Sequence, residues 1–209
     1  MTIARLRKAL AAPLPGPAAQ ARMLPPYRSA EFHAPQGSTE FAYREAAVLV
    51  LLYPLEGRLF FPLTKRSDAL RKHGGQMSLP GGAREKGESL LQAALRETEE
   101  EIGVVAADIE PLGALSNLRV APSRYEVTPF VGGLAERPSF RSDEREVAEL
   151  VEVSINELLS PESEYEATRF FEGRLWSVPC FRLCGREVWG ATAMMLAELR
   201  QVALALGAS

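Results

Sequence analysis

The 209-residue sequence is poor in two residue types that often mark covalent bracing or metal chemistry. It contains two cysteines, Cys180 and Cys184, and two histidines. Two cysteines cannot build a disulfide framework, and a C-x-x-x-C spacing with no histidine nearby is a poor zinc site. Unpaired cysteine usually behaves as a small apolar residue, so we expect two buried free thiols.

The sequence also lacks a basic surplus and a long apolar run. Its formal net charge is -3 at pH 7, whereas general nucleic-acid-binding domains are usually basic. No apolar segment approaches the roughly 20 residues that a membrane-spanning helix needs. Prolines interrupt the basic N-terminal segment, which therefore does not resemble a signal-peptide core. We expect a cytoplasmic protein that acts on a small molecule and has no nucleic-acid or membrane partner.

The composition is otherwise that of an ordinary globular protein. Hydrophobic residues make up 46% of the chain and charged residues 24%, so a core of useful size can form. Residues 1–40 are rich in alanine and proline, and we interpret them as an N-terminal extension with a short helix and a proline-rich arm. Residues 41–209 form the predicted domain.

Apolar patterning predicts mainly strands, punctuated by helices. Two apolar runs, Ala46–Pro54 and Gly57–Arg66, predict two buried strands joined by a turn at Glu56-Gly57, and the glycine-rich residues 72–82 predict a loop. Further strands are predicted at 109–116, 125–135, 146–154, 175–183 and 186–190, with a short helix at 155–159 and a closing helix at 192–206. This order predicts an α+β fold with a mixed sheet.

The segment Ser89–Ile102 predicts a helix with well-defined ends. Ser89 and Gln92 have the spacing of a capping box, and Gly103 can end the helix in the left-handed conformation. Four of the five residues from Glu97 to Glu101 are glutamates, an arrangement that is unfavourable because like charges repel on a helix.

The rotation of a helix, about 100° per residue, separates these glutamates into two groups. Glu97, Glu100 and Glu101 fall within one arc, whereas Glu99 points elsewhere. An apolar stripe is predicted about 130° away from that arc by the same arithmetic. Its residues are Leu91, Leu95, Thr98 and Ile102. Three convergent carboxylates suit a hard cation such as Mg²⁺, although a solvated acidic face would explain the helix alone.

The segment Gly81–Val104 resembles the Nudix box, G-x5-E-x7-R-E-U-x-E-E-x-G-U with U apolar. Thr98 stands where an aliphatic residue is usual, and its methyl group keeps some apolar character. The residues at the other fixed positions are Gly82, Glu88, Arg96, Glu97, Glu100, Glu101, Gly103 and Val104.

This resemblance implies a Nudix-type α/β/α sandwich with a central mixed β-sheet. It also implies a loop–helix–loop that binds Mg²⁺ or Mn²⁺ and cleaves a nucleoside diphosphate linked to another group. Glu97, Glu100 and Glu101 would bind the metal, and one of them, with Glu100 as our candidate, could orient or deprotonate the attacking water. Arg96 would pair with the carboxylates of the box, and Glu88 would brace the loop against the helix.

The preceding segment, Pro62–Gly82, resembles the motif of the coenzyme A pyrophosphatase branch, L-L-T-x-R-[SA]-x3-R-x3-G-x3-F-P-G-G. Pro62 replaces the first leucine and Leu79 replaces phenylalanine, and both changes keep an apolar residue. The matching residues are Leu63, Thr64, Arg66, Ser67, Arg71, Gly75, Pro80, Gly81 and Gly82.

The resemblance implies hydrolysis of coenzyme A to adenosine 3′,5′-bisphosphate and 4′-phosphopantetheine. Coenzyme A carries a 3′-phosphate besides its diphosphate, and arginine forks suit phosphate oxygens. Gly82 would give the loop its tight backbone. The substrate-binding candidates are Lys65, Arg66, Arg71, Gly81 and Gly82, with Lys72 as a further cation.

Several alternatives stay open. The basic residues could be ordinary surface charges, and His73 could contact substrate or be a plain loop residue. Glu144 and Glu146, which precede a strand predicted on the far side of the domain, could supply a general base or be solvated loop acids. Another substrate, such as ADP-ribose, NADH or a nucleoside triphosphate, is the main rival function. A nucleotide-sensing module without turnover is the other rival, and the complete glutamate set argues against it.

Overall fold

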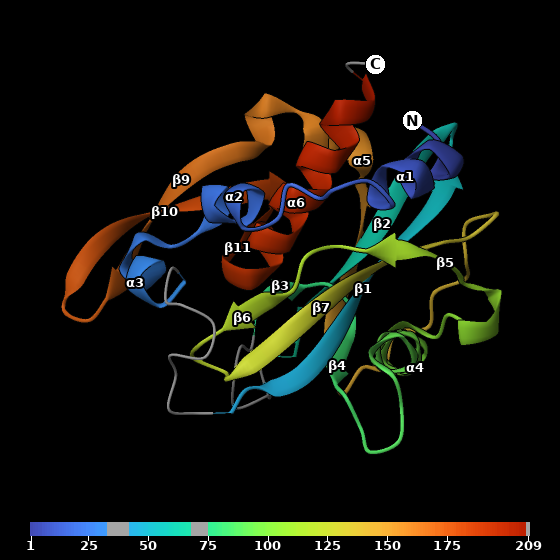
Figure 1. The fold of residues 1–209 in the computed structure, drawn as a ribbon, viewed down its shortest axis with the longest axis horizontal. Coiled ribbons are helices and arrows are strands. Elements are labelled where there is room, and N and C mark those ends of the chain that lie inside the picture. Colours follow the sequence, from blue (N-terminus) through green and yellow to red (C-terminus); the bar gives the residue numbers. More distant parts are fainter. Residues whose placement is uncertain (33–41, 68–74, 208–209) are drawn as a thin grey trace.

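The computed structural model describes residues 1–32, 42–67 and 75–207, which form layers of helices around a mixed sheet (Figure 1). The sheet follows the order β3-β2-β1-β7-β5, with β4 paired to β1, β6 to β7 and β8 to β2. β1 and β7 run parallel, and the other pairs are antiparallel. The strands are β1 Arg44–Leu55, β2 Arg58–Arg66, β3 Met77–Ser78, β4 Gly81–Ala83, β5 Glu110–Ala114, β6 Leu118–Val120, β7 Tyr125–Gly133 and β8 Val147–Ser154.

A second, antiparallel sheet has the order β11-β10-β9 and lies beside the first (Figure 1). Its strands are β9 Glu164–Phe171, β10 Arg174–Leu183 and β11 Arg186–Trp189. The helices are α1 Ile3–Leu10, α2 Pro17–Gln20, α3 Ser29–Phe32, α4 Leu90–Ile102, α5 Ile155–Leu159 and α6 Gly190–Gly207. Short 3₁₀ turns lie at Ala21–Met23, Pro26–Arg28, Ala106–Asp108 and Pro161–Ser163.

The central strand β1 is buried on both faces. Leu49 and Leu51 pack in a cluster with α4, whereas Val50 and Leu52 pack in the larger cluster that includes α6. Alternate side chains of a strand point to opposite faces, so an apolar run without polar interruptions is what a strand covered on both sides requires. The predicted central mixed sheet, with helices on its two faces, is confirmed.

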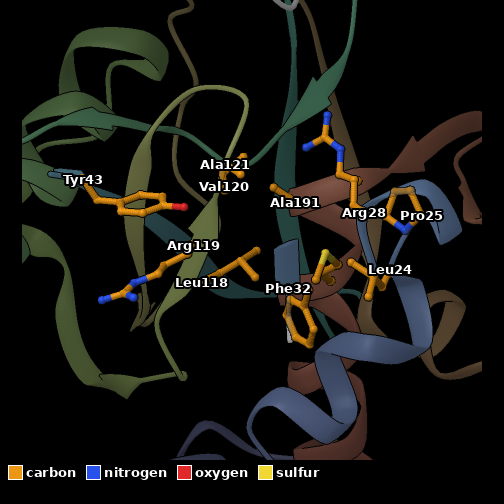
Figure 2. A pocket seen from close by; sticks show the side chains of 12 residues that line it. Leu24, Pro25, Arg28, Phe32, Tyr43, Leu118, Arg119, Val120, Ala121 and Ala191 are labelled. Atoms are coloured by element: carbon orange, nitrogen blue, oxygen red, sulfur yellow. The ribbon is translucent and has the colours of Figure 1, made fainter. Parts of the chain in front are cut away.

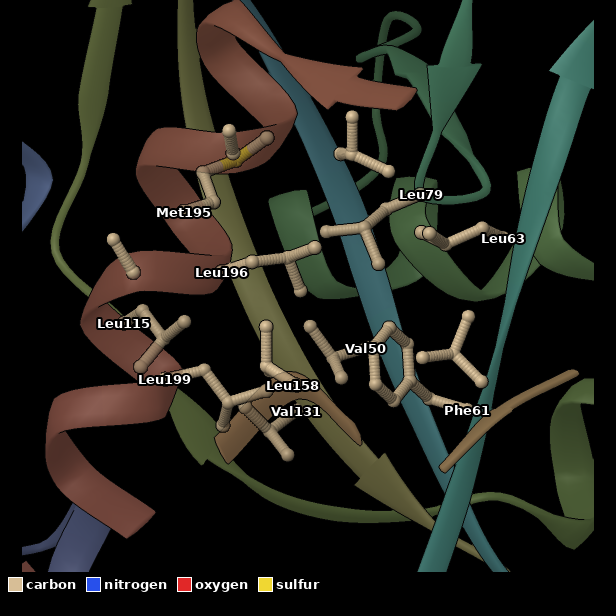
Figure 3. Close-up of a cluster of buried hydrophobic side chains, with 14 of the residues drawn as sticks. Val50, Phe61, Leu63, Leu79, Leu115, Val131, Leu158, Met195, Leu196 and Leu199 are labelled. Carbon is tan, nitrogen blue, oxygen red and sulfur yellow. The ribbon is translucent and has the colours of Figure 1, made fainter. Parts of the chain in front are cut away.

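The larger core cluster fixes α6 to the sheet (Figure 3). Leu196 and Leu199 of α6 point toward Val50 of β1 and Phe61 of β2, and all four side chains are fully buried. Burying one such side chain contributes roughly 1.5–3 kcal/mol, so these contacts hold α6 firmly on the sheet.

Most predicted elements are present, and the omissions are short or polar strands. The helix at 155–159 and the closing helix are confirmed, as is the turn at Glu56-Gly57, whose φ angles of 50° and 74° fit a two-residue hairpin. Residues 75–82, the described part of the predicted loop, include β3 and the first two residues of β4. The strands β6 and β9 were not predicted, because β6 is three residues long and β9 alternates charged with aromatic residues.

The N-terminal segment 1–32 packs against the rest of the protein. Leu6, Ala19 and Met23 are buried, and α1 and α2 contact α6. The short helix predicted near the N-terminus is confirmed as α1. The boundary predicted at residues 40–41 lies outside the described residues, and the division into extension and domain stays a prediction.

A buried carboxylate, Glu198 of α6, holds this segment in place. It is fully buried, and its oxygens accept hydrogen bonds from the Gly16 amide at 3.1 Å and the Gln20 side chain at 3.0 Å. They also accept from Ser116, through its amide at 3.1 Å and its hydroxyl at 2.7 Å. One side chain thus joins the arm, the β5–β6 connection and α6.

One of the two cysteines differs from expectation. Cys180 is buried as predicted, but the prediction of a buried thiol is wrong for Cys184, which is exposed. Cys184 begins the β10–β11 turn with a φ of 49°, and the following Gly185 has a φ of 69°. The turn places this residue at the surface. Among the described residues, no helix is both long and apolar enough to cross a membrane.

Replacing Glu198 with alanine should destabilise the protein by about 2–4 kcal/mol, because several buried donors would lose their acceptor together. Denaturant unfolding monitored by circular dichroism measures this change. Gln201→Ala on the exposed side of the same helix is the control, with an expected change below about 0.5 kcal/mol. Equal midpoints for the two variants would contradict the role of Glu198.

Candidate active site

The acidic helix α4 begins and ends as its sequence predicts. The Ser89 hydroxyl accepts a hydrogen bond from the Gln92 amide at 3.2 Å, and the Gln92 side chain accepts one from the Ser89 amide at 2.8 Å. Gly103 ends the helix with a φ of 71°. These caps satisfy backbone groups that helix ends leave without partners, so the position of α4 along the sequence is well defined.

The buried face of α4 is rotated from the predicted one. Ala93, Ala94, Thr98 and Ile102 face the sheet, whereas Leu91 lies outside the core cluster. Glu101 belongs to this buried face and is only 4% exposed. The prediction that the apolar stripe and the glutamates lie on separate faces is therefore wrong for Glu101, whereas Thr98 and Ile102 of the predicted stripe are buried as expected. The small side chains of Ala93 and Ala94 allow the helix to pack close to the sheet. The predicted face was wrong because it was drawn from the leucines and left the alanines out.

Thr98 fits the position where the family pattern has an aliphatic residue. The side chain is fully buried, and its hydroxyl donates to the Ala94 carbonyl at 2.7 Å, one helical turn earlier. The hydroxyl is thereby satisfied within the helix. Threonine thus avoids the penalty of an unpaired buried polar group at this position.

Arg96 lies at the centre of the acidic cluster and pairs with three carboxylates. Its guanidinium binds Glu88 through two nitrogens, with Nε–Oε2 at 3.1 Å and Nη2–Oε1 at 2.9 Å. Its Nη1 donates to Glu97 at 2.9 Å and to Glu100 at 3.0 Å. Nη2 also lies 3.3 Å from the carbonyl of Ala83 in β4. The planar fork thus connects the helix to the loop that precedes it.

The carboxylate of Glu97 occupies the space above Gly82. A Cβ atom built on Gly82 would lie 2.3 Å from both Cδ and Oε1 of Glu97, far closer than atoms can approach. The left-handed conformation belongs to the neighbouring Gly81, with a φ of 151°, whose added Cβ would meet the Ala47 carbonyl oxygen at 2.3 Å. Glycine is therefore required at 81 by the backbone and at 82 by the carboxylate.

The electrostatics of the cluster differ from one carboxylate to the next. Burial raises the pKa of Glu97 above its usual range; Arg96 opposes this shift, and the charges of Glu100 and Glu146 add to it. The hydrogen bond from Arg96 lowers the pKa of Glu88, and the same bond raises the pKa of Arg96. The Glu100 side chain is 61% exposed, so it is the member of the set most accessible to solvent.

The loop before β8 packs against the last turn of α4. The Asp143 amide donates to the Glu101 carbonyl at 3.0 Å, and the Arg141 amide donates to the Ile102 carbonyl at 2.9 Å. The loop that carries Glu144 and Glu146 therefore lies beside the helix of the acidic cluster. Among the two glutamates of the loop, Glu146 is close enough to influence the pKa of Glu97. The loop thus contacts the C-terminal end of α4, where the last carbonyl groups of the helix accept its amides.

The cluster fits a divalent cation by the chemistry of its donors. Carboxylate oxygens are the ligands that Mg²⁺ and Mn²⁺ prefer, and Glu97, Glu100 and Glu101 lie on consecutive turns of one helix. Across the described ranges, no three carboxylate, histidine or cysteine side chains are grouped closely enough to hold one ion as they stand. Arg96 pairs with two of these three glutamates and with Glu88, and its single positive charge offsets only part of the negative charge of the cluster.

The structure describes part of the second motif. Lys65 and the backbone of Arg66 lie at the end of β2, and the Ser67 amide donates to the Glu146 carbonyl at 2.9 Å. The predicted cations Arg71 and Lys72, and His73, lie outside the described residues. The end of β2 and the loop beside α4 are therefore joined by a direct hydrogen bond.

A scan against protein families matches the description "NUDIX domain" over residues 43–172. The chain belongs to the Nudix family. Two similar proteins are named uncharacterized Nudix hydrolase NudL, from Yersinia pestis (strain Pestoides F) and Yersinia pseudotuberculosis serotype O:1b (strain IP 31758). Each is 38% identical over 160 residues, which cover 76% of this chain and 79% of the relative. Nudix hydrolases generally use divalent metal ions such as Mg²⁺ or Mn²⁺.

Solved Nudix structures share the fold at low sequence identity. The Nudix hydrolase RenU of M. smegmatis is 22% identical with a TM-score of 0.53, and the match covers 79% of this chain and 88% of that one. A MutT protein from Methanosarcina mazei Go1 is 21% identical with a TM-score of 0.51, covering 78% and 96%. These likenesses support the Nudix fold and carry no information on substrate.

Replacing Gly82 with alanine should lower the turnover of this Nudix hydrolase about 100-fold, because the new methyl group would displace the Glu97 carboxylate by about an ångström or more. The melting temperature should change little, since the displaced group is the end of a flexible side chain. Gly81→Ala is the comparison, and it should lower the melting temperature because its methyl group meets backbone. Wild-type turnover by the Gly82→Ala protein would contradict the requirement for Glu97 at this position.

Proposed function

We propose that the protein hydrolyses the diphosphate bond of coenzyme A in the presence of Mg²⁺ or Mn²⁺. The products are adenosine 3′,5′-bisphosphate and 4′-phosphopantetheine, with water adding across the phosphoanhydride. The observation that carries the hydrolytic part is the Arg96 cluster, in which one guanidinium holds Glu88, Glu97 and Glu100 beside the Gly81-Gly82 loop.

The residues of the cluster have different roles in this proposal. Glu97, Glu100 and Glu101 would hold the metal, which supplies Lewis-acid polarisation of a phosphoryl oxygen and a lower pKa for bound water. Arg96 keeps the carboxylates at fixed positions, and Glu88 ties Arg96 to the loop. Glu100 is the proposed base because its carboxylate is the most exposed of the three. Glu146 stays the alternative, since its charge reaches Glu97.

The choice of coenzyme A depends on the motif that joins β2 to β4. This motif leads from Lys65 and Arg66 at the end of β2 to the glycines over which Glu97 lies. Lys65, Arg66, Arg71 and Lys72 supply more positive charge than a diphosphate beside a metal requires, which suits a substrate with an additional phosphate. They can bind the diphosphate, the 3′-phosphate or both.

The direct test is incubation of the protein with coenzyme A and Mg²⁺ or Mn²⁺, followed by chromatographic identification of the products. We expect adenosine 3′,5′-bisphosphate and 4′-phosphopantetheine in equal amounts. ADP-ribose, NADH and nucleoside triphosphates are assayed in parallel. A higher kcat/KM for one of these would replace coenzyme A as the substrate, and no metal-dependent turnover of any of them would favour a nucleotide sensor.

Glu97→Gln and Glu101→Gln should each lower kcat by about two orders of magnitude or more at saturating Mg²⁺, because an amide is a far weaker ligand for a hard cation than a carboxylate. Circular dichroism should show a preserved fold. Glu99→Gln, an exposed change on the same helix, is the control and should retain nearly full activity. Near-normal turnover by either variant would remove that residue from the metal set.

Dephospho-coenzyme A, which lacks the 3′-phosphate, should be a poorer substrate than coenzyme A by about tenfold or more in kcat/KM. A charge-assisted hydrogen bond contributes roughly 1.5–3 kcal/mol, so the loss of one or two gives this ratio. Parallel steady-state assays measure it. Equal kcat/KM values would show that the protein does not recognise the 3′-phosphate and is a more general dinucleotide pyrophosphatase.

A further inference from the structure

The loop between β7 and β8, residues 134–146, contacts two parts of the candidate active site within four residues. The Asp143 amide donates to the Glu101 carbonyl in the last turn of α4 at 3.0 Å. The Glu146 carbonyl accepts a hydrogen bond at 2.9 Å from the Ser67 amide, directly after β2. Both contacts are made by backbone groups, so they depend on the path that the loop takes.

Asp143 closes a tight turn at the end of this loop. Its side-chain oxygen Oδ1 accepts a hydrogen bond from the Arg145 amide, two residues later, at 3.0 Å. Such a bond is the defining contact of an Asx turn. The carbonyl of Asp143 accepts from the amides of Glu146 at 3.0 Å and Val147 at 2.8 Å. One residue therefore shapes the turn through both its side chain and its backbone.

The amide bond contributes more to this turn than the neighbouring ion pair. The Arg145 guanidinium donates to Asp143 at 3.0 Å through Nε and at 2.6 Å through Nη2, and it lowers the pKa of Asp143 to about 2. The carboxylate is thus ionised at neutral pH. The Arg145 side chain is 88% exposed, so water and salt screen the pair. The bond to the amide is internal to the turn.

The first half of the loop is fixed to the sheet independently of Asp143. Arg137 donates to the Glu152 carboxylate of β8 at 2.8 Å through Nε and at 2.6 Å through Nη2. The buried Tyr53 of β1 donates to the same carboxylate at 2.9 Å, and the Phe140 ring lies edge-on to Tyr53 with 5.6 Å between the centroids. A change at Asp143 is therefore expected to affect the turn at 143–147 and leave residues 134–140 in place.

The loop also packs tightly against the end of α4. The Arg141 amide donates to the Ile102 carbonyl at 2.9 Å. A Cβ atom built on Gly103 would lie 2.8 Å from both the Cβ atom and the carbonyl oxygen of Arg141. Helix and loop are thus in direct contact where the helix ends. The turn that follows has a defined position relative to α4.

This turn carries Glu146, whose charge reaches Glu97 and adds to the rise in its pKa. The Glu146 side chain is exposed, so its position depends on its backbone. We infer that Asp143 is a positioning residue for the hydrolytic reaction and acts through Glu146, which its turn holds beside the acidic cluster. The inference rests on the proposed function for the role of the cluster. It assigns the reaction to Glu146 rather than Glu144 among the acids of the loop.

The first test measures kcat and KM with Mg²⁺ and coenzyme A, or with whichever of the parallel substrates the wild-type protein hydrolyses. Asp143→Ala should lower kcat about tenfold or more and change KM less than about threefold, because a misplaced group lowers turnover. Asp143→Asn should keep kcat within about threefold, since its side-chain oxygen accepts the same amide. Ser142→Ala, an exposed change one residue earlier, is the control and should leave both constants unchanged.

A double-mutant cycle tests whether Asp143 acts through Glu146. Glu146→Gln alone should lower kcat about tenfold or more. Adding Asp143→Ala to that variant should lower kcat less than about twofold further, because the group that Asp143 positions has already been removed. If Asp143→Ala does not fold, Asp143→Ser takes its place. Its hydroxyl accepts the amide more weakly, so its kcat should lie between those of the alanine and asparagine variants.

Amide hydrogen exchange, measured by NMR on the metal-free protein, tests the turn without any turnover. Asp143→Ala should raise the exchange rates of the Glu146 and Val147 amides about tenfold or more, because the turn that holds them loses its side-chain bond. Asp143→Asn and Ser142→Ala should leave these rates within about threefold of the wild-type values.

Three results would overturn the inference: unchanged exchange in Asp143→Ala, equal losses of kcat in Asp143→Ala and Asp143→Asn, or independent losses in the double-mutant cycle. Any of these together with wild-type turnover of coenzyme A contradicts the positioning role alone. The expected pattern of kcat values with another substrate of the panel supports the positioning role and contradicts coenzyme A as the substrate. Absence of turnover of every substrate contradicts both proposals.

Discussion

The guanidinium of Arg96 lies among three carboxylates whose mutual repulsion would otherwise separate the second half of α4 from the loop that precedes the helix. The rest of the site depends on these ion pairs. The bidentate bond to Glu88 fixes the loop, and the bond to Glu97 places its carboxylate over Gly82. The capping box at Ser89 fixes where the helix begins, and therefore where Arg96, Glu97 and Glu100 lie relative to the loop.

Local features of the sequence predicted a large part of this arrangement. The caps of α4 and the β1–β2 turn follow from short-range geometry, so the sequence alone was enough to predict them. The buried face of α4 did not follow, because Ala93 and Ala94 contribute little to an apolar pattern but permit close packing on the sheet. The position of Glu146 was also missed, since it depends on a loop that packs against a helix about forty residues earlier.

The two faces of the central sheet carry different features. The carboxylates belong to α4 on one face, whereas residues of the arm, β6 and α6 line a small pocket on the side of the other core cluster (Figure 2). The two regions meet at the start of β1, which pairs with the Gly81-Gly82 loop. The apolar strand β1 therefore positions both the acidic cluster and the pocket. The family match at residues 43–172 contains neither the arm nor α6, so two of the three walls of the pocket lie outside it.

The hydrogen bond between Gly16 and Glu198 spans 182 residues of the chain. A ribosome adds about 5–20 residues per second, so the arm is exposed for roughly 10–35 seconds before its partner on α6 is synthesised. During that interval Leu6 and Met23, which are buried in the finished protein, have no α6 to pack against. The central sheet can assemble earlier, because its strands all precede β9 in the chain. Closure of the arm onto α6 is therefore a late event in the biosynthesis of this protein, and the interval before it is when the nascent chain is most exposed to aggregation and to chaperones.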